Sequence, residues 1–215
     1  MNIILIAPPA AGKGTQSELI CNKYDVKHIS TGDLIRNVIN SNTEKSSELK
    51  SIIDQGKLVS DEFVLDLIKE EIKDGKSYIF DGFPRTLNQA KLFDELLNQL
   101  NKQVDYVIYL DITKEVASKR ILGRISCSSC GKVYNDQIEE LMPKQNGICD
   151  TCNSNLSKRN DDNEETFNTR FDTYIENTKP LLDYYKDKLF IVDSSLNKYE
   201  IFKQIENIIG AYDKN

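Results

Sequence analysis

A short apolar run leads directly into a loop that is suited to binding phosphate. Residues 3–6 are continuously apolar, which predicts a strand buried on both faces. The chain continues with Ala7-Pro8-Pro9-Ala10-Ala11-Gly12-Lys13-Gly14-Thr15, where a tight turn can direct backbone N–H groups at an anion as a helix begins. Lys13 adds a positive charge, and the Thr15 hydroxyl can reach a magnesium ion. This order predicts a phosphate site; the alternative is a core strand that ends in a Pro-rich turn.

The charge balance argues against several classes of function. The 215 residues carry a formal net charge of −6, which disfavours nucleic acid or an anionic membrane as the main partner. No apolar stretch approaches the ~20 residues needed to cross a bilayer. The N-terminal apolar run has no basic region before it and ends within the loop, unlike a signal peptide. We therefore expect a cytoplasmic protein with one sizeable core and small insertions.

Four of the five cysteines have the spacing of a metal site. Two C-x-x-C pairs, Cys127 with Cys130 and Cys149 with Cys152, are separated by eighteen residues, which predicts a structural zinc ion held by four thiolates. Two disulfides are the alternative, but a reducing cytosol disfavours them. A redox motif is less favoured, because both pairs lie in polar loop sequence. Cys21 stands apart on a predicted helix, where it is expected to be a small buried residue.

Hydrophobic patterning predicts alternating strands and helices. The expected strands are 2–7, 27–29, 78–81, 105–111 and 189–192, and the expected helices are 13–23, 33–40, 46–55, 61–73, 87–100, 114–122, 164–185 and 198–211. Short apolar strands separated by helices predict an α/β fold, a three-layer, doubly wound parallel sheet. Residues 31–59 and 124–161 break this alternation. We expect them to be insertions over the ligand-binding edge of a core made of 1–30, 60–123 and 162–215.

Arginine is scarce, which makes its positions informative. Only six of the 28 basic residues are arginine: Arg36, Arg85, Arg120, Arg124, Arg159 and Arg170. Lysine evidently serves on the general surface, so arginine should remain where a planar, always-charged group is needed for bidentate contact with phosphate. The alternative is six surface ion pairs, each contributing little to stability.

Taken together, the phosphate loop, the arginines and the two insertions resemble those of adenylate kinases of the long-lid, zinc-bearing bacterial form. The resemblance covers nearly the whole chain and is carried by Gly12-Lys13-Gly14-Thr15-Gln16, Ser30-Thr31-Gly32-Asp33-Leu34-Ile35-Arg36, Gly56-Lys57-Leu58-Val59-Ser60-Asp61-Glu62, Phe80-Asp81-Gly82-Phe83-Pro84-Arg85-Thr86, Arg120-Ile121-Leu122-Gly123-Arg124 and Arg159-Asn160-Asp161-Asp162. It implies a fold of the P-loop class, a monomer, and Mg²⁺-dependent exchange of a phosphoryl group, ATP + AMP ⇌ 2 ADP. Residues 31–59 would bind AMP, and residues 124–161 would form the zinc-bearing lid.

The resemblance also implies roles for individual residues. The ATP site would comprise Ala10, Ala11, Gly12, Lys13, Gly14, Thr15, Arg120, Arg124, Val133, Tyr134 and Leu196. The AMP site would comprise Thr31, Arg36, Lys57, Leu58, Val59, Gly82, Phe83, Pro84, Arg85, Gln89, Arg159 and Arg170. The catalytic set would be Lys13, Asp81, Arg85, Arg120, Arg124, Arg159 and Arg170, with Asp81 orienting the waters around Mg²⁺. The chemistry needs no side-chain base, so His28 is expected to have a packing role.

Some positions leave alternatives open. Gln89 also fits a helix capping box that begins at Thr86. The family usually has glycine at Ala7 and Ala10, so either these residues have ordinary φ or the loop is slightly strained. The family often has a glycine near Leu196, beside the ATP adenine. A contact between adenine and the backbone near Leu196 uses no side chain, so it could still form without this glycine.

Three other functions are alternatives, and a feature of the sequence argues against each. A UMP or CMP kinase usually has a different residue at Thr31 and lacks the four cysteines. A zinc-ribbon module that binds nucleic acid would be basic, unlike this chain. A nucleotide hydrolase would need a residue that places water, and would not need Arg36 or Arg85.

Overall fold

Five parallel strands form the central sheet of the molecule. The computed structural model describes residues 1–41, 46–73 and 76–212; the other residues of the predicted segments 31–59, 60–123 and 162–215 lie outside the described residues. The strands are β1 (Asn2–Ile6), β2 (Lys27–Ser30), β3 (Tyr78–Asp81), β4 (Tyr106–Asp111) and β8 (Leu189–Asp193). Their order is β2-β3-β1-β4-β8, and every pairing is parallel. The predicted parallel sheet is confirmed, with strand bounds shifted by at most a residue or two.

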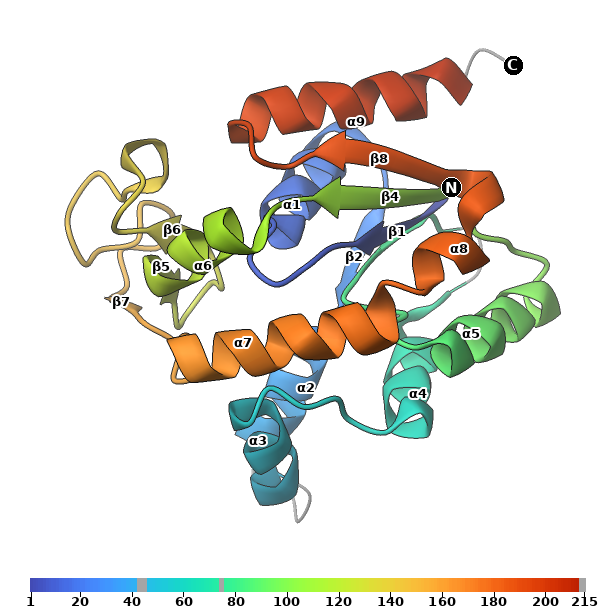
Figure 1. Ribbon diagram of the computed structural model, residues 1–215, viewed down its shortest axis with the longest axis horizontal. Coiled ribbons are helices and arrows are strands. Elements are labelled where there is room, and N and C mark those ends of the chain that lie inside the picture. Colours follow the sequence, from blue (N-terminus) through green and yellow to red (C-terminus); the bar gives the residue numbers. More distant parts are fainter. Residues whose placement is uncertain (42–45, 74–75, 213–215) are drawn as a thin grey trace.

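Helices cover both faces of this sheet (Figure 1). They are α1 (Lys13–Lys23), α2 (Thr31–Asn40), α3 (Ser46–Asp54), α4 (Asp61–Glu71), α5 (Leu87–Gln99), α6 (Lys114–Leu122), α7 (Glu164–Thr173), α8 (Leu181–Tyr184) and α9 (Lys198–Tyr212). On β1, Ile4 and Ile6 pack in one core with residues of α2, α4, α5 and α8. Ile3 and Leu5 pack in a second core with residues of α1, α6, α7 and α9. Alternate side chains of one strand thus fill opposite faces, as a doubly wound sheet requires.

A second, smaller sheet lies apart from the first, at the left of Figure 1. It is antiparallel and has the order β6-β5-β7, formed by β5 (Arg124–Cys127), β6 (Val133–Asn135) and β7 (Leu156–Ser157). A short 3₁₀ helix, η1 (Glu139–Leu141), lies between β6 and β7. These strands cannot be predicted from the sequence pattern, because each has only two to four residues and none shows a usable alternation.

The predicted helix 164–185 is wrong in its middle. The α7 helix ends at Thr173 and is followed by a π-helical turn, η2 (Tyr174–Thr178), then by α8 and a 3₁₀ turn, η3 (Lys186–Lys188). Pro180, just after the π turn, has no backbone N–H to donate, so a regular helix cannot continue through it. Apolar periodicity remains similar across such a change in pitch, which is why it was not predicted.

No helix in the described part of the chain is both long enough and apolar enough to cross a bilayer.

Candidate active site

The loop between β1 and α1 has the backbone of an anion site. Gly12 has φ 93° and immediately precedes α1, and Ala10 has φ 62°. Ala7 is not among the described residues with positive φ, so the backbone strain lies at Ala10 alone of these two alanines. The first turn of α1 carries no acidic side chain, which leaves its N–H groups and its positive dipole end open to an anion.

Lys13 and Asp81 interact electrostatically beside this loop. Burial lowers the pKa of Lys13 to about 8; the Asp81 carboxylate opposes this shift, whereas Arg85 and other guanidiniums add to it. Burial alone would raise the pKa of Asp81, but His28 and Lys13 hold it below its usual value. A Cβ added to Gly14 would lie 3.8 Å from Asp81 Oδ2, so the carboxylate is close to the loop backbone.

His28 contacts a predicted catalytic residue. Its Nε2 atom lies 3.4 Å from Asp81 Oδ2, because β2 and β3 run side by side and end together. The expectation of a packing role alone therefore missed this contact. The available signal was its place near the end of a parallel strand, where polar side chains of neighbouring strands meet.

Five of the six arginines form one cluster of interacting charges, and three of them, Arg85, Arg124 and Arg170, also act on Lys13. Burial lowers the pKa of Arg85 to about 10, and the charges of Arg170 and Arg36 contribute to the shift. Burial likewise lowers the pKa of Arg159 to about 10, with contributions from Arg124 and Arg36. Such mutual repulsion is costly without a counter-anion, so this cluster is suited to a ligand that carries several negative charges.

Carboxylates and a backbone carbonyl hold four of these guanidiniums. Arg124 Nε donates to Asp162 Oδ2 at 2.7 Å, and Arg170 Nη1 donates to Asp161 Oδ2 at 2.8 Å. Arg36 pairs with Asp33 on its own helix, and Arg85 Nε donates to the Gly82 carbonyl at 2.7 Å. These contacts hold four of the five guanidiniums in place.

Arg120 lies outside this cluster. Its guanidinium donates to the carbonyls of Ser194 at 2.8 Å and of Leu196 at 3.4 Å. Burial lowers its pKa and Asp193 opposes the shift, with no contribution from another arginine. Arg120 and Leu196 are thus brought together next to the phosphate loop, where the Ser194 hydroxyl donates to the Ala11 carbonyl.

A cavity opens beside the loop and contains most of the predicted AMP site. The predicted residues that line it are Lys13, Thr31, Arg36, Lys57, Leu58, Val59, Gly82, Pro84, Arg85, Gln89 and Arg170. Gly82 has φ 79°, and a Cβ there would lie 2.9 Å from both Arg85 Nη2 and Thr31 Oγ1, so only glycine fits. Phe83 does not line the cavity: it is 1% exposed and packs edge-on against Phe93 in the core.

Gln89 makes half of the expected capping box. Its backbone N–H donates to Thr86 Oγ1 at 3.1 Å, as predicted for a capped helix. Its side chain, however, does not return to Thr86: Oε1 accepts from the Arg85 N–H at 2.7 Å and Nε2 donates to Asp61 at 2.8 Å. These two hydrogen bonds of the Gln89 side chain therefore hold the Arg85 backbone in place at the cavity wall.

Several other residues that line the cavity were not predicted as site residues, among them two that follow Arg170. Tyr174 and Thr178 line the cavity from the π turn, four and eight residues after Arg170. That helical spacing from a candidate binding arginine was the signal that could have identified them.

Val133 and Tyr134 on β6 differ in exposure. Val133 is 42% exposed, whereas Tyr134 is 6% exposed and packs with Ile125 and two of the cysteines. The Tyr134 ring is therefore part of the small core, and a contact with adenine at this residue would have to use its backbone.

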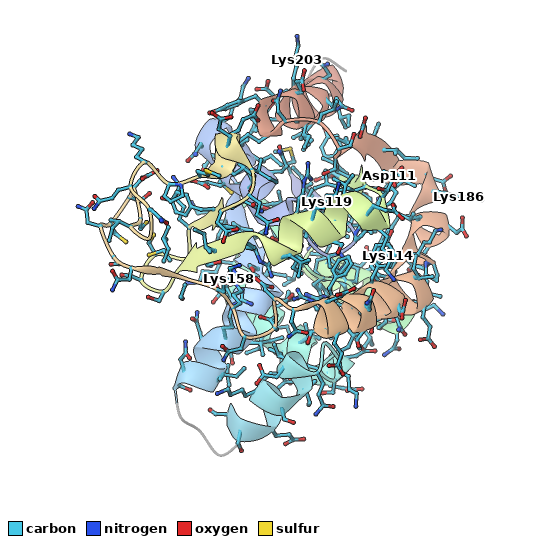
Figure 2. The ribbon with its side chains drawn as sticks, turned by 60° about the vertical axis from the view of Figure 1, so that its left-hand side comes forward. Asp111, Lys114, Lys119, Lys158, Lys186 and Lys203 are labelled. Carbon is cyan, nitrogen blue, oxygen red and sulfur yellow. The ribbon has the colours of Figure 1, made fainter. Side chains whose placement is uncertain are left out.

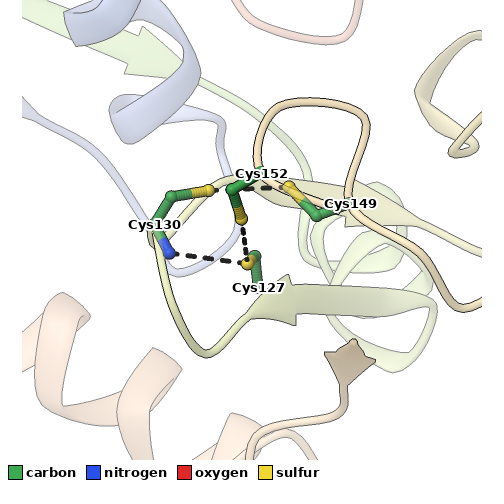
Figure 3. Close-up of side chains that lie close together, drawn as sticks. All are labelled: Cys127, Cys130, Cys149 and Cys152. Atoms are coloured by element: carbon green, nitrogen blue, oxygen red, sulfur yellow. Dashed lines mark hydrogen bonds between the residues drawn. The ribbon is translucent and has the colours of Figure 1, made fainter. Parts of the chain in front are cut away.

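The four cysteines converge as a zinc site requires (Figure 3). Their sulfur atoms all lie within 4.8 Å of one another, with Cys127 Sγ 3.4 Å from Cys152 Sγ and Cys130 Sγ 3.5 Å from Cys149 Sγ. Ligands at ~2.3 Å from a tetrahedral zinc ion lie ~3.8 Å apart, so the donor set fits. All four cysteines are free thiols, in contrast to the disulfide alternative.

Comparison with known proteins identifies the family of this chain. The family model "Adenylate kinase" matches residues 5–190. The chain is similar to the adenylate kinase of Petrotoga mobilis, with 39% identity over 216 residues and 100% of each chain covered. It is 42% identical to that of Fervidobacterium nodosum over 219 residues, again with 100% of each chain covered. It is also 42% identical to that of Clostridium tetani over 218 residues, covering 98% of this chain and 99% of the relative. With its phosphate loop, arginine cluster and adjoining cavity, this chain belongs to the adenylate kinase family.

Proposed function

We propose that this chain carries out the reaction of its family, Mg²⁺-dependent transfer of the terminal phosphoryl group of ATP to AMP, between the phosphate loop and the cavity. The observation that carries the proposal is the cluster of interacting guanidiniums beside Lys13, formed by Arg36, Arg85, Arg124, Arg159 and Arg170. A single bound phosphate would not need so many cations, whereas two nucleotides that meet end to end would.

ATP would bind on the loop side. Its phosphates would lie on the backbone of Ala10 to Thr15, with Lys13 and Arg124 as positive partners. Arg120 would join them after exchanging its carbonyl contacts at Ser194 to Leu196 for phosphate oxygens. The exposed Val133, the Tyr134 backbone and the Leu196 backbone would border the adenine.

AMP would occupy the cavity. Arg36 and Arg85 would bind its phosphate, and Arg159 and Arg170 would reach both this phosphate and the transferring group. Thr31, Gln89 and the Lys57-Leu58-Val59 backbone would border the base. Gly82 and Pro84 would shape the wall, whereas Phe83 would act from the core by fixing that wall.

The reaction would depend on alignment and charge. The attacking phosphate oxygen of AMP is already ionised near neutral pH, so no side-chain base is needed. Guanidiniums on both sides would hold the two nucleotides in line and neutralise charge on the transferring group. Closure of residues 124–161 over the site would exclude water and so prevent loss of the phosphoryl group by hydrolysis.

Two metal ions belong to the proposal. The Thr15 hydroxyl and the ionised Asp81, through bound water, would hold Mg²⁺; when bound, this ion neutralises charge on the ATP phosphates. The four cysteines would hold zinc as a structural ion, because four protein ligands leave no position for water. The zinc ion would stabilise the small sheet without touching the phosphates.

The proposed function includes a compartment, an oligomeric state and a set of partners. We propose that it works as a cytoplasmic monomer without a nucleic acid or membrane partner, consistent with a net charge of −6. Light scattering after gel filtration measures the mass in solution, and a dimer would contradict this part.

A coupled assay for ADP tests the reaction. ADP formation from ATP should require AMP and should fall strongly when UMP or CMP replaces it. Lys13→Met should abolish most activity, whereas the matched variant Lys203→Met should not; Lys203 is exposed on α9, at the top of Figure 2. ADP release from ATP alone at an equal rate would instead indicate a hydrolase, and equal rates with UMP would indicate a broader kinase.

A further inference from the structure

The π turn after α7 is anchored at its first residue. Lys179 N donates to the Tyr174 carbonyl at 2.8 Å, the five-residue spacing of a π helix. The Tyr174 hydroxyl donates to the Tyr109 hydroxyl at 3.0 Å, and that hydroxyl donates to Asp111 Oδ1 at 3.0 Å. The turn is therefore tied to β4 at its start, and its other end faces the cavity.

Thr178, the last residue of the turn, contacts the backbone of Arg85, another residue that lines the cavity. Its hydroxyl donates to the Arg85 carbonyl at 2.9 Å, across 93 positions of sequence, and the residue is 8% exposed. Arg85 is also held by the Gln89 side chain and by Gly82, but both belong to its own segment. Among these three contacts, only Thr178 ties the Arg85 loop to the element that follows Arg170.

The hydrogen bond between Thr178 and Arg85 connects two segments whose arginines repel each other. The positive charge of Arg170 contributes to the lowered pKa of Arg85, so the two guanidiniums are close enough to interact. A carboxylate bridge would hold them but would also compete with phosphate for both side chains. A bond from a neutral hydroxyl to a backbone carbonyl sets their separation without occupying either guanidinium.

We propose that Thr178 is a positioning residue that sets Arg85 relative to Arg170, so that both guanidiniums can bind the phosphate of AMP. The inference rests on the proposed function of the cavity. Thr178 acts through the backbone of Arg85 and does not itself contact the reacting groups. Loss of its hydroxyl should therefore weaken the binding of AMP rather than that of ATP.

Thr178→Val tests this proposal, because valine keeps the shape and loses the hydroxyl. We expect KM for AMP to rise roughly fivefold, the order of one lost neutral hydrogen bond, with KM for ATP changed less than twofold. Thr178→Ser restores the hydroxyl and should return KM for AMP to within twofold of the unaltered protein. Calorimetry of AMP binding without ATP should show the same ranking, independent of turnover.

Thr169→Val is the matched control, since its hydroxyl donates only to the Glu165 carbonyl within α7. It should leave both KM values unchanged. If valine disturbs folding, as monitored by circular dichroism, Thr178→Ala replaces it with the same expectation. Equal shifts in both KM values, or no difference between the serine and valine variants, would overturn the inference. Failure of the unaltered protein to use AMP would instead reject the proposed function.

Discussion

Among the described non-glycine residues, Ala10 has a positive φ together with two asparagines, which adopt it more readily than alanine. Its φ of 62° lies in the left-handed region, where an L-residue is strained by roughly 1–2 kcal/mol. Ala10→Gly should relieve this strain, partly offset by roughly 0.4–1 kcal/mol of added chain entropy in the unfolded state. We expect a net gain in the free energy of unfolding of roughly 0.5–1 kcal/mol, measured by urea denaturation.

Ala7→Gly is the matched control for that variant. Ala7 has no positive φ and is 8% exposed, so glycine there only adds chain entropy and removes a buried methyl group. We expect it to destabilise the protein by about 1 kcal/mol. Equal effects of the two substitutions would show that the backbone at Ala10 is unstrained.

Lys13 makes ATP binding sensitive to alkaline pH. Its pKa of about 8 in the ligand-free protein means that roughly half of these side chains are uncharged at pH 8. Bound phosphates favour the charged form, so binding should take up protons at pH 8, and ATP affinity should fall as the pH rises from 7 to 9.5. Calorimetry in buffers of different ionisation enthalpy measures this uptake. Lys13→Met should lack it, and equal uptake by that variant would assign the protons to other groups.

The same lowered pKa affects stability in a defined direction. A lysine whose pKa is about 8 when folded and 10.5 when unfolded binds fewer protons in the folded state between these values. Its contribution to the free energy of unfolding therefore rises with pH across that window. The site thus holds a charge that disfavours folding at neutral pH and is suited to binding anions.

At the scale of elements, the small sheet depends on its cysteines. Its described core is small, comprising Ile125, Cys127, Tyr134 and Cys149 with Leu156 packed against them. So few apolar side chains contribute little hydrophobic free energy, and a bound metal can supply the rest. Removal of zinc with a chelator should therefore melt residues 124–161 at lower temperature than the five-stranded sheet.

Tyr134 links β6 to this cysteine cluster. Its hydroxyl accepts from the Asp150 N–H at 2.8 Å and lies 3.6 Å from Cys149 Sγ, so it can donate its own proton to this sulfur when zinc holds the cysteine as a thiolate. We expect Tyr134→Phe to weaken zinc affinity roughly tenfold or more, as measured by competition with a chromophoric chelator. Tyr199→Phe, at a residue 65% exposed on α9, is the control. Unchanged zinc affinity in Tyr134→Phe would leave the tyrosine with a packing role only.

At the scale of the whole molecule, three arginines, Arg36, Arg124 and Arg170, are paired with acidic residues, which we expect the phosphates of bound nucleotides to replace. Arg124 and Asp162 form a pair with exposed side-chain fractions of only 15% and 0%. Asp162→Asn leaves this guanidinium buried without a charged partner and should destabilise the ligand-free protein by on the order of 3 kcal/mol. A two-headed nucleotide analogue that spans both sites would supply phosphates instead. The analogue should therefore raise Tm more in this variant than in the unaltered protein.

Asp136→Asn provides the comparison for that experiment. Asp136 pairs with Lys158, and their side chains are 37% and 53% exposed, so little free energy depends on them. The analogue should raise the Tm of this variant and of the unaltered protein equally. An equal rise in Asp162→Asn as well would mean that Arg124 keeps its carboxylate when nucleotides bind.

The sequence by itself determined the elements and the chemical class of the site. Strands and helices follow from apolar spacing over a few residues, and the phosphate loop and cysteine pairs are local patterns whose residues lie within one turn. These features depend on near neighbours, so they can be predicted without the fold. The strands β5 to β7 were not predicted because they are too short to show a hydrophobic alternation. The π turn was not predicted because its apolar spacing is close to that of the α-helix before it.

Only the tertiary structure decided how side chains from distant segments meet. It grouped five arginines and left Arg120 on the carbonyls of Ser194 to Leu196, and it buried the Tyr134 ring beside Cys149. It also set the bond between Thr178 and Arg85. Each of these contacts joins residues far apart in the chain, and its geometry depends on how strands and helices pack between them. Residue type and spacing carry no record of that packing, so such contacts can be found only in three dimensions.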